Sequence, residues 1–313
     1  MTEAEDILIV GTGAMATLFA ARLGRAGYAV TMLGSWPEAL AALRSNGARL
    51  VEDPGREQRI RVTVRSDPRD CRGARYALVL VKSWQTETAA RALAECLAES
   101  GVALTLQNGL GNREILAASL GAQRVALGST TTGATLLGPG LAKAGGEGVV
   151  SIESHSHIAP LQAALRRAGF QVEVVQDARV LIWSKLVVNS AINPLTAILR
   201  VPNGQLLERP AARQLLRALA EETAAVAHAE QVSLATSDPV DMVEAVALGT
   251  ATNHSSMFQD VQRGAPTEID AICGAVTLAG RQHSVPTPMN QACWHLVQAL
   301  TQAPRQPSTS AYT

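Results

Sequence analysis

The two halves of the chain differ in the periodicity of their apolar residues. The first half alternates short apolar runs with helix-forming stretches, and glycine or polar turns separate them. This alternation predicts parallel strands with helices on both faces, because each strand–helix–strand unit buries its strands on both sides. We expect the Thr- and Gly-rich pieces between 128 and 152 to be antiparallel strands that close the same sheet. The other expected elements are strands at 6–10, 29–33, 60–64, 76–81, 102–107 and 171–175, and helices at 14–26, 37–45, 86–98 and 160–168.

Strand patterns almost vanish beyond residue 177. Long Ala/Leu-rich periodic stretches follow, broken by proline and glycine turns, and they predict an all-helical second half. The fold class is therefore α/β, with a Rossmann-like doubly wound sheet over 1–176 and a helical substrate domain over 177–303. The polar residues 304–313 are expected to form a flexible tail. The expected helices of the second half are 180–199, 210–231, 239–253, 267–283 and 287–300.

Composition narrows the class of protein. Hydrophobic residues make up 47% and charged residues 17%, as in soluble globular enzymes. Lys plus Arg equals Asp plus Glu, at 27 each, so no overall basic field is available to attract nucleic acid or an anionic membrane. The four cysteines lack CxxC spacing and the six histidines lack metal-ligand spacing, which predicts reduced core thiols and no metal. A strand that starts within a few residues of Met1 leaves no room for a signal peptide, and we expect a cytoplasmic protein.

A glycine-rich turn follows the first expected strand and opens the first expected helix. In the pattern GxGxxA, Gly11 permits a tight turn, Gly13 lets the backbone approach a pyrophosphate, and Ala16 packs the helix against the strand. The helix N-terminus presents free N–H groups to the anion. A turn that serves only packing is the alternative. The expected nucleotide-binding residues here are Gly11, Thr12, Gly13, Ala14, Met15 and Ala16.

The end of the second strand selects the nucleotide. An acidic residue there binds the ribose of NAD, and an arginine favours the 2′-phosphate of NADP. Gly34 and Ser35 supply neither, but the absence of a carboxylate removes repulsion of a phosphate and Ser35 can donate a hydrogen bond. Lys82, after a later strand, adds positive charge. These residues favour NADPH and leave NAD open.

Asn108 ends another expected strand, at the carboxyl edge where open α/β sheets bind ligands. Its amide suits a contact with nicotinamide or substrate. An Asn-Gly turn with no binding role is the alternative.

Lys185, Asn189 and Asn193 are spaced by four along an otherwise apolar helix. An advance of four residues along a helix corresponds to a rotation of about 400° and a rise of about 6 Å. The three side chains therefore share a narrow stripe on one face. A lysine among apolar residues loses hydration, which lowers its pKa toward the working pH and suits a proton donor. A core helix with a snorkelling lysine is the alternative. A membrane span is disfavoured by this stripe together with Pro194.

These segments and several others make the chain resemble the ketopantoate reductases, or 2-dehydropantoate 2-reductases. The resemblance extends over nearly the whole chain, and the Lys-x3-Asn-x3-Asn-Pro-Leu-Thr string with the later Ser-Ser-Met and Thr-Glu-Ile-Asp strings is its most specific part. Gly34 departs from the pattern, because many members carry a phosphate-binding arginine there. Ala16 replaces a frequent third glycine. The matching segments are 11–16, 82–85, 107–111, 128–132, 183–196, 202–204, 255–260 and 267–270.

The resemblance implies reduction of 2-dehydropantoate to (R)-pantoate with NADPH, on the route to pantothenate and coenzyme A. It implies that Lys185 is the general acid and that Glu268 binds the substrate hydroxyl, influences the charge of Lys185 and belongs to the cofactor-binding set. Lys82 and Asn108 would contact the cofactor. The implied substrate-binding residues are Asn108, Asn189, Asn193, Asn203 and Ser256.

Some alternatives remain open at this point. Glu268 follows Pro266, and it could equally be a solvated acid in the first turn of a helix. Ser255 and Ser256, near the end of the preceding helix, could equally be capping residues. A reductase of another branched or aromatic 2-oxo acid, possibly with NAD, is the nearest rival function, and a non-catalytic nucleotide-binding sensor is a remote one. The expected partner is a small 2-oxo acid, and the Ala-rich helices allow a homodimer.

Overall fold

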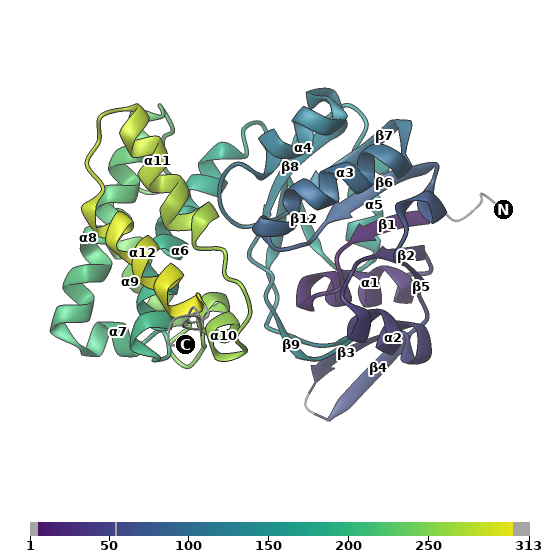
Figure 1. Cartoon of the computed structure of the whole chain (residues 1–313), viewed down its shortest axis with the longest axis horizontal. Coiled ribbons are helices and arrows are strands. Elements are labelled where there is room, and N and C mark those ends of the chain that lie inside the picture. The colour runs from purple at the N-terminus through teal and green to yellow at the C-terminus, as the bar shows by residue number, and fades with distance from the viewer. Residues whose placement is uncertain (1–5, 54, 303–313) are drawn as a thin grey trace, which may run out of the picture. The chain divides into compact units, whose positions relative to one another are not determined.

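The computed structural model describes residues 6–53 and 55–302, so the tail expected at 304–313 lies outside the described residues. The chain divides into two compact units, the first ending at Ile182 and the second beginning at Trp183 (Figure 1). The boundary falls inside a helix, α6 (Arg179–Leu199).

The first unit is built on an eight-stranded sheet with the order β12-β11-β8-β7-β6-β1-β2-β5. Neighbouring strands from β5 through β8 pair in parallel, β11 is antiparallel to β8, and β12 is parallel to β11. The predicted fold class is confirmed. The strands are β1 (Asp6–Val10), β2 (Ala29–Leu33), β5 (Thr63–Arg65), β6 (Ala74–Val79), β7 (Leu97–Thr105), β8 (Val125–Thr130), β11 (Val149–Glu153) and β12 (Gln171–Val175).

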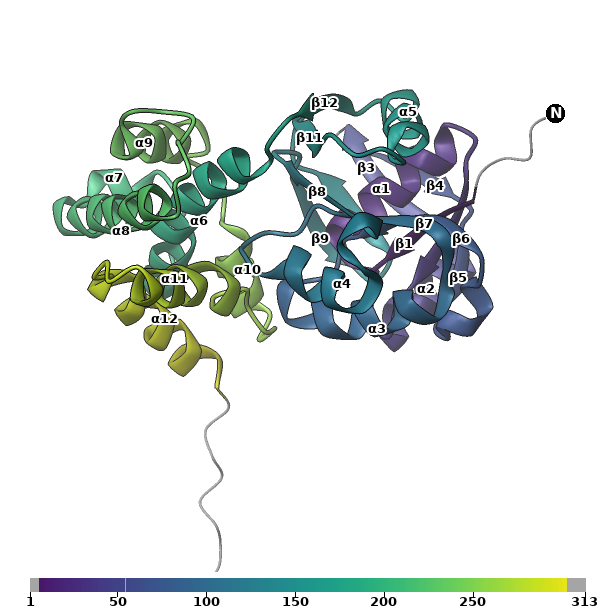
Figure 2. The ribbon, with the colours of Figure 1, turned by 90° about the horizontal axis from the view of Figure 1, so that it is seen from above.

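Helices cover both faces of this sheet. Helices α1 and α5 lie on one face and α3 and α4 on the other (Figure 2). Along β1 the side chains alternate between two cores, with Ile7 and Ile9 in one and Leu8 and Val10 in the other. A strand buried on both faces must be apolar throughout, which explains why its bounds were predictable. The helices are α1 (Ala14–Arg25), α2 (Pro37–Asn46), α3 (Thr86–Cys96), α4 (Asn112–Leu120) and α5 (Ala159–Arg167).

A second, four-stranded sheet was not predicted. Its order is β4-β3-β10-β9, and it packs on α1, where Arg22 Nε bonds Glu52 Oε1 at 2.8 Å. The expected antiparallel closure of the main sheet is therefore wrong for β9 and β10, since only β11 closes it. The expected strand at 60–64 is also wrong: Ile60 ends β4 by pairing with Ala48, and β5 starts only at Thr63. The strands are β3 (Ala48–Asp53), β4 (Arg56–Ile60), β9 (Ala134–Gly138) and β10 (Leu141–Ala144).

In the described part of the second unit, every regular element is a helix. As expected, Asp238 caps α9, because its carboxylate accepts from the backbone N–H groups of Val240 and Asp241. The single helix expected at 267–283 is wrong: a π-helical turn, η4 (Asp270–Gly274), precedes α11. None of the described helices has the length and apolar character needed to span a membrane. Besides α6, the helices are α7 (Gln205–Glu208), α8 (Pro210–Ala229), α9 (Pro239–Gly249), α10 (Ser256–Gln262), α11 (Ala275–Gln282) and α12 (Pro288–Thr301).

Pro194 lies inside α6 and leaves one backbone carbonyl without its helical donor. Proline has no N–H, so the carbonyl of Ser190, four residues earlier, lacks its usual partner. The thiol of Cys273 donates to that oxygen at 3.7 Å. Burial raises the pKa of the Cys273 thiol well above its ordinary value, which keeps the donor proton in place. This contact attaches the π-helical turn to α6.

The contact predicts unequal effects of two cysteine substitutions in this unit. Cys273→Ala should lower the free energy of unfolding more than Cys293→Ala, by about 1 kcal/mol for the lost hydrogen bond. Both cysteines are buried, at 0% and 3% exposure, so packing losses are comparable. Urea unfolding followed by circular dichroism measures both variants. Equal losses would show that the thiol contributes nothing beyond packing.

Candidate functional site

The turn between β1 and α1 has the backbone that close approach to a ligand requires. Gly11 adopts φ +129°, and a Cβ there would lie 3.0 Å from the carbonyl oxygen of Leu80, so only glycine fits without strain. Gly13 is the N-cap of α1 and, having no side chain, makes no capping hydrogen bond to the N–H groups of the first turn. A Cβ on Gly13 would meet nothing within 4 Å. Open space before an uncapped helix N-terminus fits a pyrophosphate.

The other nucleotide-binding candidates of the first unit lie in this turn or after the strands β2 and β6. Thr12 and Ala16 are buried, and Ala14 and Met15 are partly buried. Ser35 is exposed between β2 and α2. Lys82 follows β6, is partly buried, and caps the 3-10 turn η2 (Ser83–Gln85) with its backbone in an extended conformation.

Asn108 follows β7 in a loop that a buried polar network holds. The side chain of Asn112 donates to the Asn108 carbonyl at 3.0 Å, and its Oδ1 lies 2.8 Å from the Thr86 hydroxyl. Gln107 Nε2 donates to the same hydroxyl at 2.8 Å and to the Val81 carbonyl at 3.1 Å. Gly109 has φ +83°, so the segment does form a glycine turn. Sequence reasoning missed Thr86 and Asn112, because neither stands out until α3 and α4 are packed together.

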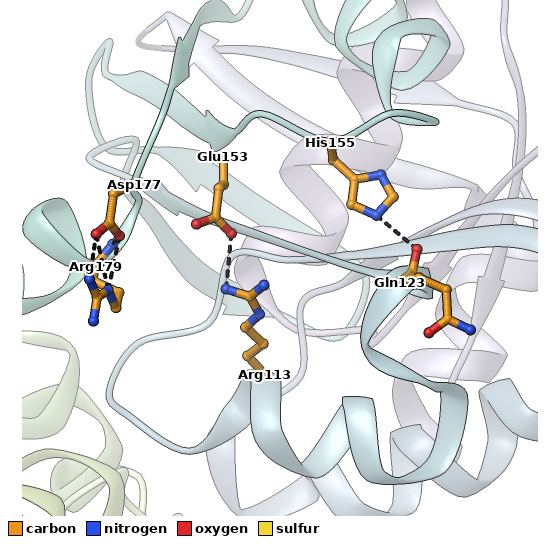
Figure 3. Close-up of polar contacts among 6 residues, drawn as sticks. All are labelled: Arg113, Gln123, Glu153, His155, Asp177 and Arg179. Atoms are coloured by element: carbon orange, nitrogen blue, oxygen red, sulfur yellow. Dashed lines mark hydrogen bonds and ion pairs between the residues drawn. The ribbon is translucent and has the colours of Figure 1, made fainter.

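One ion pair attaches the helix after this loop to the sheet, and two further polar contacts lie nearby (Figure 3). Arg113, in the first turn of α4, bonds Glu153 at the end of β11 at 2.9 Å. The His155 ring bonds the Gln123 carbonyl at 2.9 Å. Asp177 accepts from the backbone and guanidinium of Arg179, and these bonds hold the pKa of the Asp177 carboxyl below its ordinary value. Of these contacts only the Arg113–Glu153 pair anchors α4, and none of the three involves an expected catalytic residue.

In the second unit, Lys185 and Glu268 form an electrostatic pair. Lys185 is partly buried, and the loss of hydration lowers the pKa of its ammonium group to about 8, although the negative charge of Glu268 opposes that change. Glu268 is 5% exposed, so it is not a solvated first-turn acid. It lies just before the π-helical turn, and its carbonyl accepts from the Ile272 N–H at 3.1 Å. A lysine with a pKa near neutral pH can both donate and accept a proton.

The amide stripe continues along α6 toward α10. Asn189 is partly buried and Asn193 is buried. Thr196, one turn further, donates to Ser255 Oγ at 2.7 Å, and that oxygen also accepts from the Phe258 N–H. Ser255 is therefore the N-cap of α10, which confirms for this residue the capping alternative left open by the sequence. Thr196 is a third residue that sequence reasoning missed, although its spacing of three from Asn193 is visible in the string.

Two expected substrate-binding residues have side-chain atoms available for a ligand. Ser256, the first residue of α10, is exposed and does not serve as the cap. Asn203 is buried; its Nδ2 donates to Thr250 Oγ1 at 2.9 Å, while its Oδ1 has no hydrogen-bond partner in the described part of the chain. A buried carbonyl oxygen without a partner is costly, and a ligand hydroxyl would satisfy it. Among residues 6–53 and 55–302, no cluster of His, Cys, Asp or Glu is suited to hold a metal ion.

Family models and a curated relative match nearly the whole chain. The family model described as ketopantoate reductase PanE/ApbA matches residues 7–157, and its C-terminal counterpart matches 177–301. A 2-dehydropantoate 2-reductase of Halobacterium salinarum is 36% identical, over 93% of this chain and 97% of its own.

Solved structures agree with the sequence matches. The PanE/ApbA family ketopantoate reductase from Ralstonia eutropha JMP134 has a TM-score of 0.88 and 33% identity, covering 95% of this chain and 98% of its own. D-mandelate dehydrogenase, in its ternary structure with NADH and anilino(oxo)acetate, has a TM-score of 0.89 and 25% identity with the same coverage.

Proposed function

The chain belongs to the ketopantoate reductase family of NAD(P)-dependent oxidoreductases, and from this premise we propose that it reduces 2-dehydropantoate to (R)-pantoate with NADPH. The observation that carries the proposal is the partly buried Lys185, whose pKa falls to about 8 and which is paired with a buried glutamate. A proton donor of this kind is what the reduction of a ketone needs, and a nucleotide sensor has no use for it.

The proposed chemistry places the proton donor at the carbonyl oxygen. The bound cofactor supplies a hydride to the carbonyl carbon. As the C=O π electrons move to oxygen, the ammonium of Lys185 gives that oxygen a proton and becomes a neutral amine, which solvent protonates again. Before the transfer, the positive charge of Lys185 attracts the developing alkoxide. Glu268 raises the pKa of Lys185 and so keeps more of it in the protonated form.

The substrate's carboxylate and hydroxyl need directional partners. Amide and hydroxyl groups provide them without adding another full charge. We assign Asn189, Asn193 and Ser256 as donors to the substrate. The unpartnered Oδ1 of Asn203 is a suitable acceptor for the substrate hydroxyl. In the first unit, Asn108 and the turn at Gly11–Gly13 are assigned to the cofactor.

A second candidate is an NAD-dependent reductase of a bulkier 2-oxo acid. Two observations favour it: Gly34 places no arginine after β2, and the similar D-mandelate dehydrogenase was solved with NADH. It uses the same Lys185 chemistry and differs only in the side-chain pocket and in the nucleotide.

A substrate panel tests the two candidates. Purified protein is given NADPH or NADH with 2-dehydropantoate, benzoylformate and 2-oxoisovalerate, and the decrease in absorbance is followed. The proposal expects the highest kcat/KM for 2-dehydropantoate with NADPH. A preference for benzoylformate with NADH would replace it with the second candidate. Binding of NADPH without oxidation by any of the acids would favour the sensor.

A further inference from the structure

The residue after β2, where dinucleotide-binding sheets recognise the adenosine ribose, is a glycine packed closely against the side chain of Thr12. A Cβ on Gly34 would lie 2.6 Å from Thr12 Cγ2 and 3.2 Å from Thr12 Oγ1. Thr12 is 6% exposed and belongs to the glycine-rich turn itself. Position 34 therefore supplies no arginine for a 2′-phosphate, and a side chain there would require the Thr12 side chain to move. If the protein uses NADPH, another cation must perform this task.

The sheet places Arg65 beside the end of β2. Strand β5 lies beside β2 in parallel, with Arg65 opposite Leu33, the last residue of β2. The N–H of Gly34 donates to the carbonyl of Arg65 at 3.2 Å. Both strands end here, at the carboxyl edge of the sheet. The strand β5 thus ends in an arginine next to Gly34, the position at which β2 itself is followed by no arginine.

The side chain of Arg65 is exposed, and the acids that follow it in the chain are Asp67 and Asp70. Val64 is buried in the core shared with α1, so Arg65 points to the other face of the sheet, that of Leu33. Within the described ranges no ion pair includes Arg65. The nearest acid along the chain, Asp67, is occupied by Arg69, and the hydrogen bonds and charge of Arg69 lower the pKa of the Asp67 carboxyl to about 2. The end of β2 adds no carboxylate that would repel a phosphate.

We infer that Arg65 recognises the adenosine 2′-phosphate of NADPH and so determines nucleotide preference in this chain. The planar guanidinium matches a phosphate through paired N–H donors, which a neutral ribose hydroxyl cannot exploit. The inference rests on the proposed use of NADPH and names the residue responsible for it. Ser35, exposed in the adjoining loop, adds a neutral donor.

Calorimetric titration of the full-length protein tests Arg65 without any turnover. The probes are adenosine 2′,5′-bisphosphate and adenosine 5′-monophosphate, which differ only in the 2′-phosphate. The wild-type protein should bind the bisphosphate more tightly. Arg65→Gln should weaken bisphosphate binding by about 10- to 100-fold, the range for a hydrogen bond to a charged group, and leave monophosphate binding unchanged. Arg61→Gln, which removes another exposed arginine just before β5, is the matched control and should change neither.

Each other outcome overturns the inference. If Arg65→Gln still prefers the bisphosphate as the wild type does, a different cation recognises the phosphate. If the variant loses both ligands equally, Arg65 has no selective role, and a thermal melt shows whether the fold is intact. If the wild type itself does not discriminate, Arg65 does not read the phosphate. Reduction of 2-dehydropantoate with NADPH, measured separately, would then show whether the proposed reaction stands.

Discussion

Replacing Lys185 by alanine is expected to lower kcat for 2-dehydropantoate reduction by about two to four orders of magnitude, the usual loss when a general acid is removed. The physical reason is that the oxygen of the carbonyl must gain a proton as hydride arrives at carbon, and the amide groups of the stripe are far poorer acids than an ammonium. Single-turnover kinetics with NADPH measures the chemical step directly. The dissociation constant for NADPH should stay within about threefold, because the loss concerns transition-state stabilisation alone.

The chain offers a matched control, because it contains only three lysines. Lys143 is exposed on β10, and Lys143→Ala removes the same side chain from a surface position. It should retain wild-type kcat. A Lys185→Ala variant that folds, binds NADPH and turns over within threefold of the wild type would remove Lys185 from the chemistry.

Neutralising Glu268 should shift the alkaline limb of the pH–rate profile. The reduction needs Lys185 as ammonium, which is present below its pKa and lost above it, so kcat/KM should fall as pH rises through about 8. Desolvation lowers this pKa and Glu268 raises it. Glu268→Gln removes only the raising influence, so the limb should move to lower pH, and kcat/KM at pH 8 should fall about fivefold for a pKa lower by about one unit.

Glu268→Asp is the control for charge. It keeps the carboxylate, so its alkaline limb should remain near that of the wild type even if its rate is lower. A profile in which glutamine and aspartate variants share the same limb would show that Glu268 acts through shape and not through its charge.

The main sheet was largely predictable, whereas the small one was not. Strands such as β1 and β2 are buried on both faces, so an unbroken apolar run marks their bounds. In β3 the buried Ala48 and Leu50 alternate with partly exposed residues, and β4 is mostly exposed. The strand β10, which pairs with β3, lies about 90 positions further along the chain, with Leu141 opposite Arg49. A short half-exposed ribbon with so distant a partner leaves only a weak local pattern.

Within the site, the residues on one helix were predictable because helical periodicity alone places them together. Lys185, Asn189 and Asn193 needed nothing more than a spacing of four. Contacts between elements needed the packed unit: the bond from Thr196 to Ser255, and the thiol of Cys273 on the carbonyl that Pro194 leaves open. The π-helical turn after Glu268 was also hidden, because a single inserted residue in a helix has no distinct sequence pattern.

The proposed proton transfer depends on the ionisation of the Lys185 amine, and nuclear magnetic resonance can follow this ionisation directly. With three lysines in the chain, protein labelled with 13C at lysine Cε gives few signals, and the one absent from Lys185→Ala is that of Lys185. Its chemical shift should titrate with a pKa of about 8 in the protein without substrate. A titration at the ordinary lysine value of 10.5 would show a fully hydrated ammonium and contradict the desolvated proton donor.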